Sequence, residues 1–377
     1  MIISENQNAF VHGRQIQDNI LLAHEAFHHL RLKRKGSNYE LGLKVDMNKA
    51  YDRVEWDFLA AAMGRMSFDL FWIKMIMTCI TTVSFSVILN GHPGRTFYPS
   101  RGLRQGDPLS PYLFLIVSEI LSLNIRSNLE SGSLKGIKLS RRGPQMSHLF
   151  FADDSVFFCK AEELNCRRLK EILDSFYLAS GQAINYEKSC LFFSSNTTRP
   201  HVEAISRILG VREVNDPGVH LGLPTIWGRS KKAALSFIRD RIKKKLGGWK
   251  ANTLSLAGKE TLLKVVATAI PKYSMMCFHY PANLCKEING DIAKFWWGNA
   301  MDESKIHWKS WHSLCQGKES GGLGFRDLMD LNLALLGKQC WRMLSNPNAY
   351  WVRVLKAKYF PNEELMQAKV GARASWA

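Results

Sequence analysis

The sequence predicts an α+β fold in which an antiparallel sheet carries helices on one face and is followed by a mainly helical region. Up to about residue 195, strand-type and helix-type runs follow one another in a βαββαβ-like order, which builds such a sheet. Beyond residue 195 helical patterning dominates, and nine of the eleven tryptophans lie beyond residue 226. The chain has 377 residues, 46% of them hydrophobic, which is enough for two or three domains with real cores.

The helices of the first part are predicted from apolar residues at helical spacing. In the first of them, Ile16, Ile20 and Phe27 fall on one face, and the helix ends in a basic stretch. Pro108 is well placed to open the longest, because proline is tolerated in the first turn of a helix. The ranges predicted to be helical are 15–35, 55–66, 70–81, 109–130 and 162–180.

Short apolar runs bounded by turn residues predict the strands. The run 83–89 is closed by Asn90-Gly91, a strong hairpin signal. The run 147–159 is apolar on both sides of Asp153-Asp154, which indicates two strands with the acidic pair at their tight connection. The ranges predicted to form strands are 41–47, 83–89, the two halves of 147–159, and one or two strands within 183–193.

The second part of the chain is predicted to be helical and strongly basic. Its segment 229–272 combines helical patterning with twelve Lys and Arg residues against only Asp240 and Glu260. A glycine-rich turn is predicted over 317–324, followed by an apolar helix over 328–344.

The net charge of +18 and the pI near 9.6 favour polyanionic partners, either nucleic acid or an anionic membrane surface. No signal peptide is visible, and the most apolar helix-like run, 113–125, is too short to span a bilayer and contains Glu119. We therefore expect no membrane partner and an intracellular protein of the nucleus or cytoplasm. The sequence does not predict an oligomeric state.

Two acidic clusters about a hundred residues apart carry the candidate chemistry. Asp46 ends the predicted strand 41–47, and Asp153-Asp154 interrupts an apolar run, where adjacent carboxylates are costly to bury unless a cation neutralises them. Nucleotidyl transfer uses two divalent cations about 4 Å apart, and Mg²⁺ takes only one or two protein carboxylates per ion. The three aspartates supply that number. The alternative is that they are ordinary solvated turn acids.

The same residues carry a family resemblance. The stretches 45–52 (VDMNKAYD), 102–111 (GLRQGDPLSP) and 151–154 (FADD) resemble motifs A, B and C of reverse transcriptases, most closely those of plant non-LTR (LINE-type) retrotransposons. The resemblance continues through 181–189 (GQAINYEKS), similar to motif D, and 220–224 (HLGLP), similar to the motif E primer grip. Segments 249–259 and 308–338 resemble the thumb and the region beyond it.

The resemblance implies an RNA-directed DNA polymerase (a nucleotidyltransferase) with a right-hand palm, using an RNA template, a DNA primer and dNTPs. It implies that Asp46, Asp153 and Asp154 are catalytic and hold two Mg²⁺ ions, with Mn²⁺ as an alternative. It places Tyr51 beneath the incoming sugar, where its ring disfavours a 2′-hydroxyl; the alternative is a core aromatic. The remaining implied site residues are Gln105 and Gly106 for the nucleotide, Lys188 as a catalytic proton donor to pyrophosphate, and His220, Leu221 and Gly222 for the primer.

Lys188 could equally be a solvated surface lysine. The basic segment is expected to hold the template–primer duplex, and the alternative is a solvated helix face. The residues proposed for this contact are Lys231, Lys232, Arg239, Arg241, Lys243, Lys244 and Lys245.

The resemblance divides the chain into residual fingers (1–40), palm (41–195), primer grip with thumb (196–300) and a post-thumb segment (301–377), and we expect truncation at both ends. Residues 7–19 (QNAFVHGRQIQDN) match a stretch that in the family follows a fingers segment with an Arg-Pro-Ile motif, whose cation contacts the triphosphate. That motif is not found here. Arg14 and Lys49 are candidates to replace the cation, but spacing does not decide between them. The second hypothesis is therefore an element remnant that binds nucleic acid without polymerising.

Overall fold

The computed structural model describes residues 2–228, 230–248, 253–298, 305–369 and 374–375. The chain divides into two compact units. The first comprises Met1–Leu221 with Arg353–Pro361, and the second comprises Gly222–Val352 with Asn362–Ala377. Arg229, which opens the predicted basic segment, and Trp249 of the predicted thumb motif lie outside the described residues. The four-part division into fingers, palm, thumb and post-thumb segment stays a prediction.

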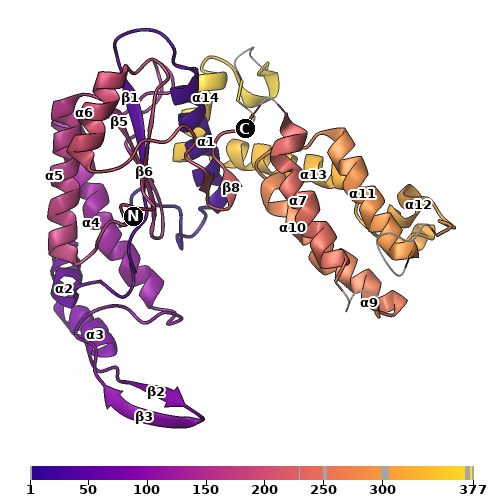
Figure 1. Ribbon diagram of the computed structural model, residues 1–377, viewed down its shortest axis with the longest axis horizontal. Helices are drawn as coiled ribbons and strands as arrows, with labels where there is room; N and C mark the ends of the chain where they lie inside the picture. The colour runs from indigo at the N-terminus through magenta and orange to yellow at the C-terminus, as the bar shows by residue number, and fades with distance from the viewer. Residues whose placement is uncertain (1, 229, 249–252, 299–304, 370–373, 376–377) are drawn as a thin grey trace. The chain divides into compact units, whose positions relative to one another are not determined.

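A four-stranded antiparallel sheet is the centre of the first unit (Figure 1). Its strands, in spatial order, are β4 (His148–Phe151), β5 (Asp154–Lys160), β1 (Glu40–Val45) and β6 (Cys190–Phe193). Val45 of β1 lies opposite Ser155 of β5, and Phe151 of β4 lies opposite Asp154. The register therefore brings the end of β1 next to the start of β5, where the predicted acidic residues lie.

Helices cover the sheet because strand residues alternate between its two faces. Leu41, Leu43 and Phe157 point into one core shared with Ile76 of α3 (Leu70–Thr81) and with four other helices. These are α2 (Trp56–Arg65), α4 (Ser110–Glu130), α5 (Glu163–Ser180) and α6 (Arg199–Leu209). The predicted α+β sheet with a helical layer on one face is confirmed. In addition, α1 (Ile16–Leu32) covers the opposite face, where Phe27 packs edge-on against Phe158 and Phe192.

The predicted hairpin is also present, and it projects from the first unit below α3 (Leu70–Thr81) in Figure 1. Strands β2 (Phe85–Leu89) and β3 (His92–Phe97) pair antiparallel around Asn90 and Gly91. Both turn residues have positive φ, +49° and +82°, as a type I′ turn requires. The remaining short strand of this unit is β7 (Val219–His220).

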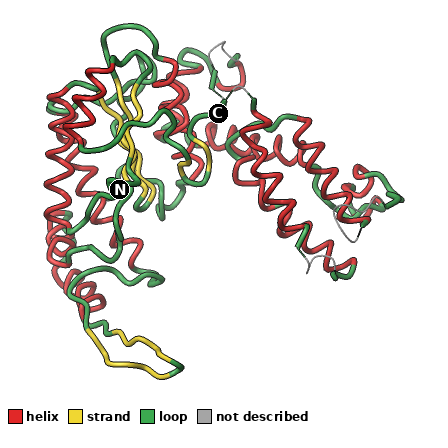
Figure 2. The backbone as a smooth tube through the Cα atoms, in the orientation of Figure 1, coloured by secondary structure: helices red, strands yellow, loops and turns green. Residues whose placement is uncertain are grey.

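The second unit is mainly helical, as Figure 2 shows. It begins with β8 (Leu223–Pro224), and the core-facing residues of α7 are spaced three and four apart. Its helices are α7 (Lys231–Leu246), α9 (Leu256–Thr261), the π-helical turn η1 (Leu262–Ala267), α10 (Ala269–Met275), α11 (Ala282–Trp297), α12 (Trp311–Cys315), η2 (Lys318–Ser320), α13 (Leu328–Ser345) and η3 (Leu365–Gln367).

The helix predicted over 328–344 is confirmed as α13. Helix α14 (Tyr350–Tyr359) starts in the second unit, and its residues from Arg353 onward belong to the first. There the Lys358 ammonium and the Tyr359 hydroxyl both bond to the Glu25 carboxylate, at 2.6 and 2.7 Å. Among the described residues, no helix combines the length and apolar character needed to cross a bilayer.

Candidate active site

The backbone positions of the three predicted carboxylates lie at one end of the β1–β5 ladder. Asp46 directly follows β1, and Asp153 occupies the turn between β4 and β5. Because Val45 pairs with Ser155, the next residues along the two strands, Asp46 and Asp154, adjoin. Asp153 is exposed, whereas Asp46 and Asp154 are partly buried. The strand register thus brings two acidic stretches that are about a hundred residues apart in sequence to the same end of the sheet.

These carboxylates repel one another. Burial raises the pKa of Asp154, and the negative charges of Asp153 and Asp46 raise it further, against an opposing effect of Lys44. Within the described part of the chain, no three metal-ligating side chains are gathered closely enough to hold an ion. The donor set is nevertheless carboxylate oxygen, the ligand that hard divalent cations prefer. In chemistry and charge the residues fit a divalent cation.

The turn that carries Asp153 is strained. Phe151 and Asp154 pair, which leaves Ala152 and Asp153 as a two-residue turn, and Ala152 has a φ of +54°, a conformation usual for glycine. The buried Gln7 supports it: its Oε1 accepts hydrogen bonds from the N–H groups of Ala152 (3.2 Å) and Ala9 (2.9 Å). Sequence reasoning gave Gln7 no role. The sequence offered one hint, which is that Gln7 lies in the 7–19 stretch that resembles the family. That resemblance does not indicate which residues Gln7 contacts.

The segment resembling motif D lies against Asp46. The Asp46 carbonyl accepts a hydrogen bond from the Asn185 N–H at 2.8 Å, and the Asp46 N–H donates to Ser189 Oγ at 3.1 Å. Lys188 lies in the loop between these two anchors, and it is exposed. The loop of Lys188 therefore lies next to Asp46, and the role of Lys188 stays a prediction.

Tyr51 packs against helix α4 and lies in the electrostatic field of the carboxylates. Its ring stacks on Phe114, with centroids 5.0 Å apart and planes 12° apart. Burial raises the pKa of the Tyr51 hydroxyl, and the charge of Asp153 raises it further, which places this hydroxyl in the field of the carboxylates. Its backbone carbonyl accepts from the Leu103 N–H at 2.8 Å, so motif B is attached here. Tyr51 is thus partly a packing residue, and it also borders the site.

The loop with Gln105 borders a pocket of about 480 Å³. Gln105 is exposed and donates from Nε2 to Asp52 Oδ1 at 3.3 Å. Gly106 has a φ of +87°, and an added Cβ would meet nothing within 4 Å, so backbone conformation rather than crowding selects glycine there. The close approach occurs at Gly102, where a Cβ would lie 2.7 Å from the Asp52 carbonyl oxygen. The pocket lining includes Asp52, Cys79, Phe85, Arg101, Arg104 and Gln105.

Two of the other candidates have buried structural contacts. Only 3% of His220 is exposed, and its Nε2 lies 2.9 Å from Asn19 Oδ1; Leu221, which follows it, has a φ of +48°. The Arg14 guanidinium donates to the carbonyls of Ile3 (3.0 Å), Ser4 and Gln7. Arg14 therefore anchors the first residues of the described chain instead of facing the carboxylates.

The basic residues of α7 divide into a paired and an open set. On the side facing α11, Arg239 pairs with Asp291 and Glu287, each at 2.6 Å, and Lys232 pairs with Glu287 at 2.5 Å. Lys243 reaches Asp291 at 4.0 Å. Arg241, Lys244 and Lys245 are exposed, with Arg241 lying 5.1 Å over the ring of Phe237. Their predicted role in duplex binding stays a prediction.

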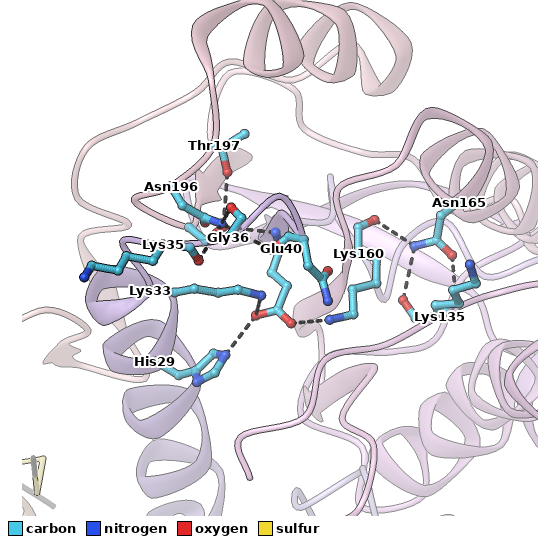
Figure 3. A network of polar contacts seen from close by, with 12 residues as sticks. His29, Lys33, Lys35, Gly36, Glu40, Lys135, Lys160, Asn165, Asn196 and Thr197 are labelled. Carbon is cyan, nitrogen blue, oxygen red and sulfur yellow. Dashed lines mark hydrogen bonds and ion pairs between the residues drawn. The ribbon is translucent and has the colours of Figure 1, made fainter. Parts of the chain in front are cut away.

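The opposite end of the same strands holds a compensated carboxylate (Figure 3). Burial opposes the ionisation of Glu40 at the start of β1, but bonds from His29 (2.8 Å), Lys160 and Lys33 (3.0 Å) outweigh it and lower the pKa of Glu40 to about 2. No site residue was predicted at this end.

Comparison with known proteins agrees with this geometry. Residues 1–221 match the family described as reverse transcriptase (RNA-dependent DNA polymerase). An uncharacterized mitochondrial protein of Arabidopsis thaliana is 43% identical over 110 residues, 29% of this chain and 71% of that protein. The Pol polyprotein of a type-1 retrotransposable element R2 from Popillia japonica is 27% identical over 171 residues, which are 45% of this chain and 27% of the polyprotein.

A solved telomerase from Candida albicans, in complex with a fragment of telomeric RNA, is 13% identical to this chain. The match covers 92% of this chain and 53% of that one, with a TM-score of 0.39, which is a distant likeness.

The antiparallel sheet and the helical region that follows it are consistent with a polymerase palm. The chain belongs to the reverse transcriptase family, and its relatives include plant proteins and non-LTR retrotransposon polyproteins, which confirms the family predicted from the motifs. Members of this family generally use divalent metal ions.

Proposed function

We propose that this chain is the RNA-directed DNA polymerase core of a LINE-type retrotransposon, with Asp46, Asp153 and Asp154 as its catalytic carboxylates. One observation carries the proposal: three acids lie at the adjoining ends of β1 and β5, where burial and the neighbouring acids raise the pKa of Asp154. Such a cluster is costly without a cation. The family match supports a nucleic-acid template; the RNA template, DNA primer and dNTPs are proposed with it. Action in the nucleus or cytoplasm stays a prediction.

The three carboxylates would hold two Mg²⁺ ions, with Mn²⁺ as an alternative. When bound, such ions neutralise charge on the attacking oxygen and on the leaving pyrophosphate. In the reaction the primer 3′-hydroxyl would give its proton to solvent water and form a P–O bond to the α-phosphorus of the dNTP. The α–β phosphoanhydride bond breaks, and pyrophosphate leaves.

The chain's own residues would orient these groups. Gln105, which lines the 480 Å³ pocket, would contact the nucleotide together with the neighbouring Gly106. Tyr51 would lie beneath the sugar of the nucleotide. Lys188 would protonate the pyrophosphate from the loop beside Asp46. The turn at His220, Leu221 and Gly222 would hold the primer, and the open basic residues of α7 would contact the duplex.

Primer extension on poly(rA)/oligo(dT) with dTTP and Mg²⁺ tests the proposal, with Asp153→Asn as control. We expect the unaltered chain to extend the primer and the control to fail. Absence of extension above the control, for a chain that circular dichroism shows to be folded, would contradict polymerase activity. Retained duplex binding in that case would favour the second candidate, a remnant that binds without polymerising, which the net charge of +18 supports.

A further inference from the structure

The buried side chain of Asn19 links β4 to the turn at His220 through hydrogen bonds. Asn19 lies on α1 and bonds in both directions: its Oδ1 is 2.9 Å from His220 Nε2, and its Nδ2 donates to the Phe150 carbonyl at 3.0 Å. Asn19 has no exposed surface, and 3% of His220 is exposed. Two segments 70 residues apart in sequence (150 and 220) are thus joined through one carboxamide.

The chemistry of the carboxamide fixes the direction of these bonds. An amide nitrogen only donates and an amide oxygen only accepts, so Asn19 Oδ1 must accept a hydrogen bond from the N–H of His220 Nε2. Burial lowers the pKa of His220 to about 3, which makes the ring neutral near pH 7. The ring is then the Nε2–H tautomer. Its buried Nδ1 has no hydrogen-bond partner among the described residues, as an unprotonated nitrogen in an apolar site allows.

Each end of this link adjoins a segment with a proposed role. The Phe150 carbonyl also accepts the Asn8 N–H at 3.0 Å, and it lies three residues before Asp153. At the other end, His220 precedes Leu221, whose φ of +48° is strained for a leucine. A strained turn keeps its shape only where its surroundings hold it, and the bond to Asn19 is one such restraint.

We propose that Asn19 is a positioning residue that sets the distance between the primer-holding turn at His220 and the hairpin that carries Asp153. The inference rests on the proposed function, in which a primer terminus held by that turn must meet the carboxylates. Asn19 itself contacts no substrate. A displacement of about 1 Å between reacting groups costs on the order of 100-fold in rate, so one buried amide is enough to matter.

The test is Asn19→Leu, which keeps a similar volume and removes the hydrogen bonds to His220 and Phe150 together with the weaker contact to Asn8. We expect the single-turnover rate of primer extension to fall about 10- to 100-fold while the KM for dTTP changes less than about threefold. The matched control is Asn8→Ala, which removes only the weaker 3.4 Å contact to Asn19 and should stay within about twofold of the unaltered chain. Asn19→Ser, too short to reach both partners, replaces Asn19→Leu if the latter does not fold.

The double variant Asn19→Leu/His220→Leu separates positioning from general packing. If the two residues act as one link, the double variant is no slower than the slower single variant. Rate losses that multiply, an unchanged rate in Asn19→Leu, or an equal loss in Asn8→Ala would each overturn the proposal.

A second readout does not depend on activity. In ¹⁵N spectra, with the ring signals assigned by comparison with His220→Gln, we expect a neutral Nε2–H ring between pH 5 and 8, and altered ring signals in Asn19→Leu. If the unaltered chain extends no primer, the proposed function fails, and these spectra alone decide whether Asn19 and His220 are linked. Identical ring signals in both proteins would overturn the link.

Discussion

The two ends of the β1–β5 ladder hold carboxylates in opposite electrical surroundings. At one end, burial and two neighbouring acids raise the pKa of Asp154. At the other, three nitrogen-bearing side chains converge on the buried Glu40 and lower its pKa to about 2. Both ends belong to the same two strands, so strand geometry does not cause the difference. The ion pairs of Glu40 stabilise the fold. The repulsion among Asp46, Asp153 and Asp154 lowers the free energy of unfolding, and a bound cation would offset this loss.

The largest expected difference between the two ends appears when one acid at each end is neutralised and the rates of primer extension are compared. Asp153→Asn should lower the rate of primer extension by about 1000-fold or more, because charge stabilisation in the transition state is worth several kcal/mol. Glu40→Gln makes the same chemical change at the far end and should leave the rate per folded molecule within about twofold. Steady-state extension, normalised to folded protein, measures both. Equal losses of rate in the two variants would show that the two ends do not differ in their importance for primer extension.

Glu40→Gln should instead lower stability. A pKa of about 2 against an ordinary 4.5, discounted for partial solvation, corresponds to about 2 kcal/mol. For a unit of this size we expect the melting temperature to fall by about 4–8 °C. Glu162→Gln, which removes an exposed ion pair to Lys135, is the matched control and should change the melting temperature by less than about 2 °C.

The contribution of Glu40 to the free energy of unfolding depends on pH in a defined way. Because the folded-state pKa of Glu40 is lowered, its contribution is fully present above about pH 4.5 and is lost as the pH falls through about 2. The difference in unfolding free energy between the unaltered chain and Glu40→Gln should therefore shrink over that interval. Denaturant titrations at several pH values measure it, and a difference that stays constant to pH 2 would show that Glu40 is not the titrating group.

The contrast between the two ends explains which features the sequence could predict. The acidic cluster was visible because Asp153 and Asp154 interrupt an apolar run, and the succession of strands and helices along the chain followed from periodicity. Glu40, Gln7 and Asn19 were not visible. Each is a single polar residue whose importance depends on partners more than a hundred residues away, in Lys160, Ala152 and His220. Local patterns record the face of an element but not the contacts of one side chain across the fold.

Charges on α7 were likewise predicted as one group, and the structure divides them. Arg239 was counted as a duplex contact from its neighbours in sequence, yet Asp291 and Glu287 of α11 pair with it. Those acids lie about fifty residues further along the chain, so composition within the 229–272 segment could not reveal them.

The variant Asp154→Asn tests whether repulsion among the acids destabilises the end of the ladder that holds Asp46, Asp153 and Asp154. The raised pKa of Asp154 means that the stability its protonation provides is present below its ordinary pKa and is lost as the pH rises through the folded-state value. The neutral amide should therefore raise the melting temperature at pH 7 without metal, because it removes the repulsion from Asp153 and Asp46. Added Mg²⁺ should stabilise the unaltered chain but not the variant. Equal stabilisation of both by Mg²⁺ would place the ion elsewhere.

The smallest expected effect concerns paired and open charges on α7. Lys245→Gln removes an exposed cation and should lower duplex affinity a few-fold at physiological salt. It should also reduce the slope of log K against log salt by about 0.9, because one fewer counterion is released on binding. Arg239→Gln removes a cation already neutralised by two carboxylates, so the salt slope should stay nearly unchanged while the melting temperature falls. Fluorescence anisotropy on an RNA–DNA duplex at four salt concentrations measures the slopes. If Arg239→Gln reduces the slope as much as Lys245→Gln does, the paired set also contacts nucleic acid, and pairing does not separate structural from functional charges in this protein.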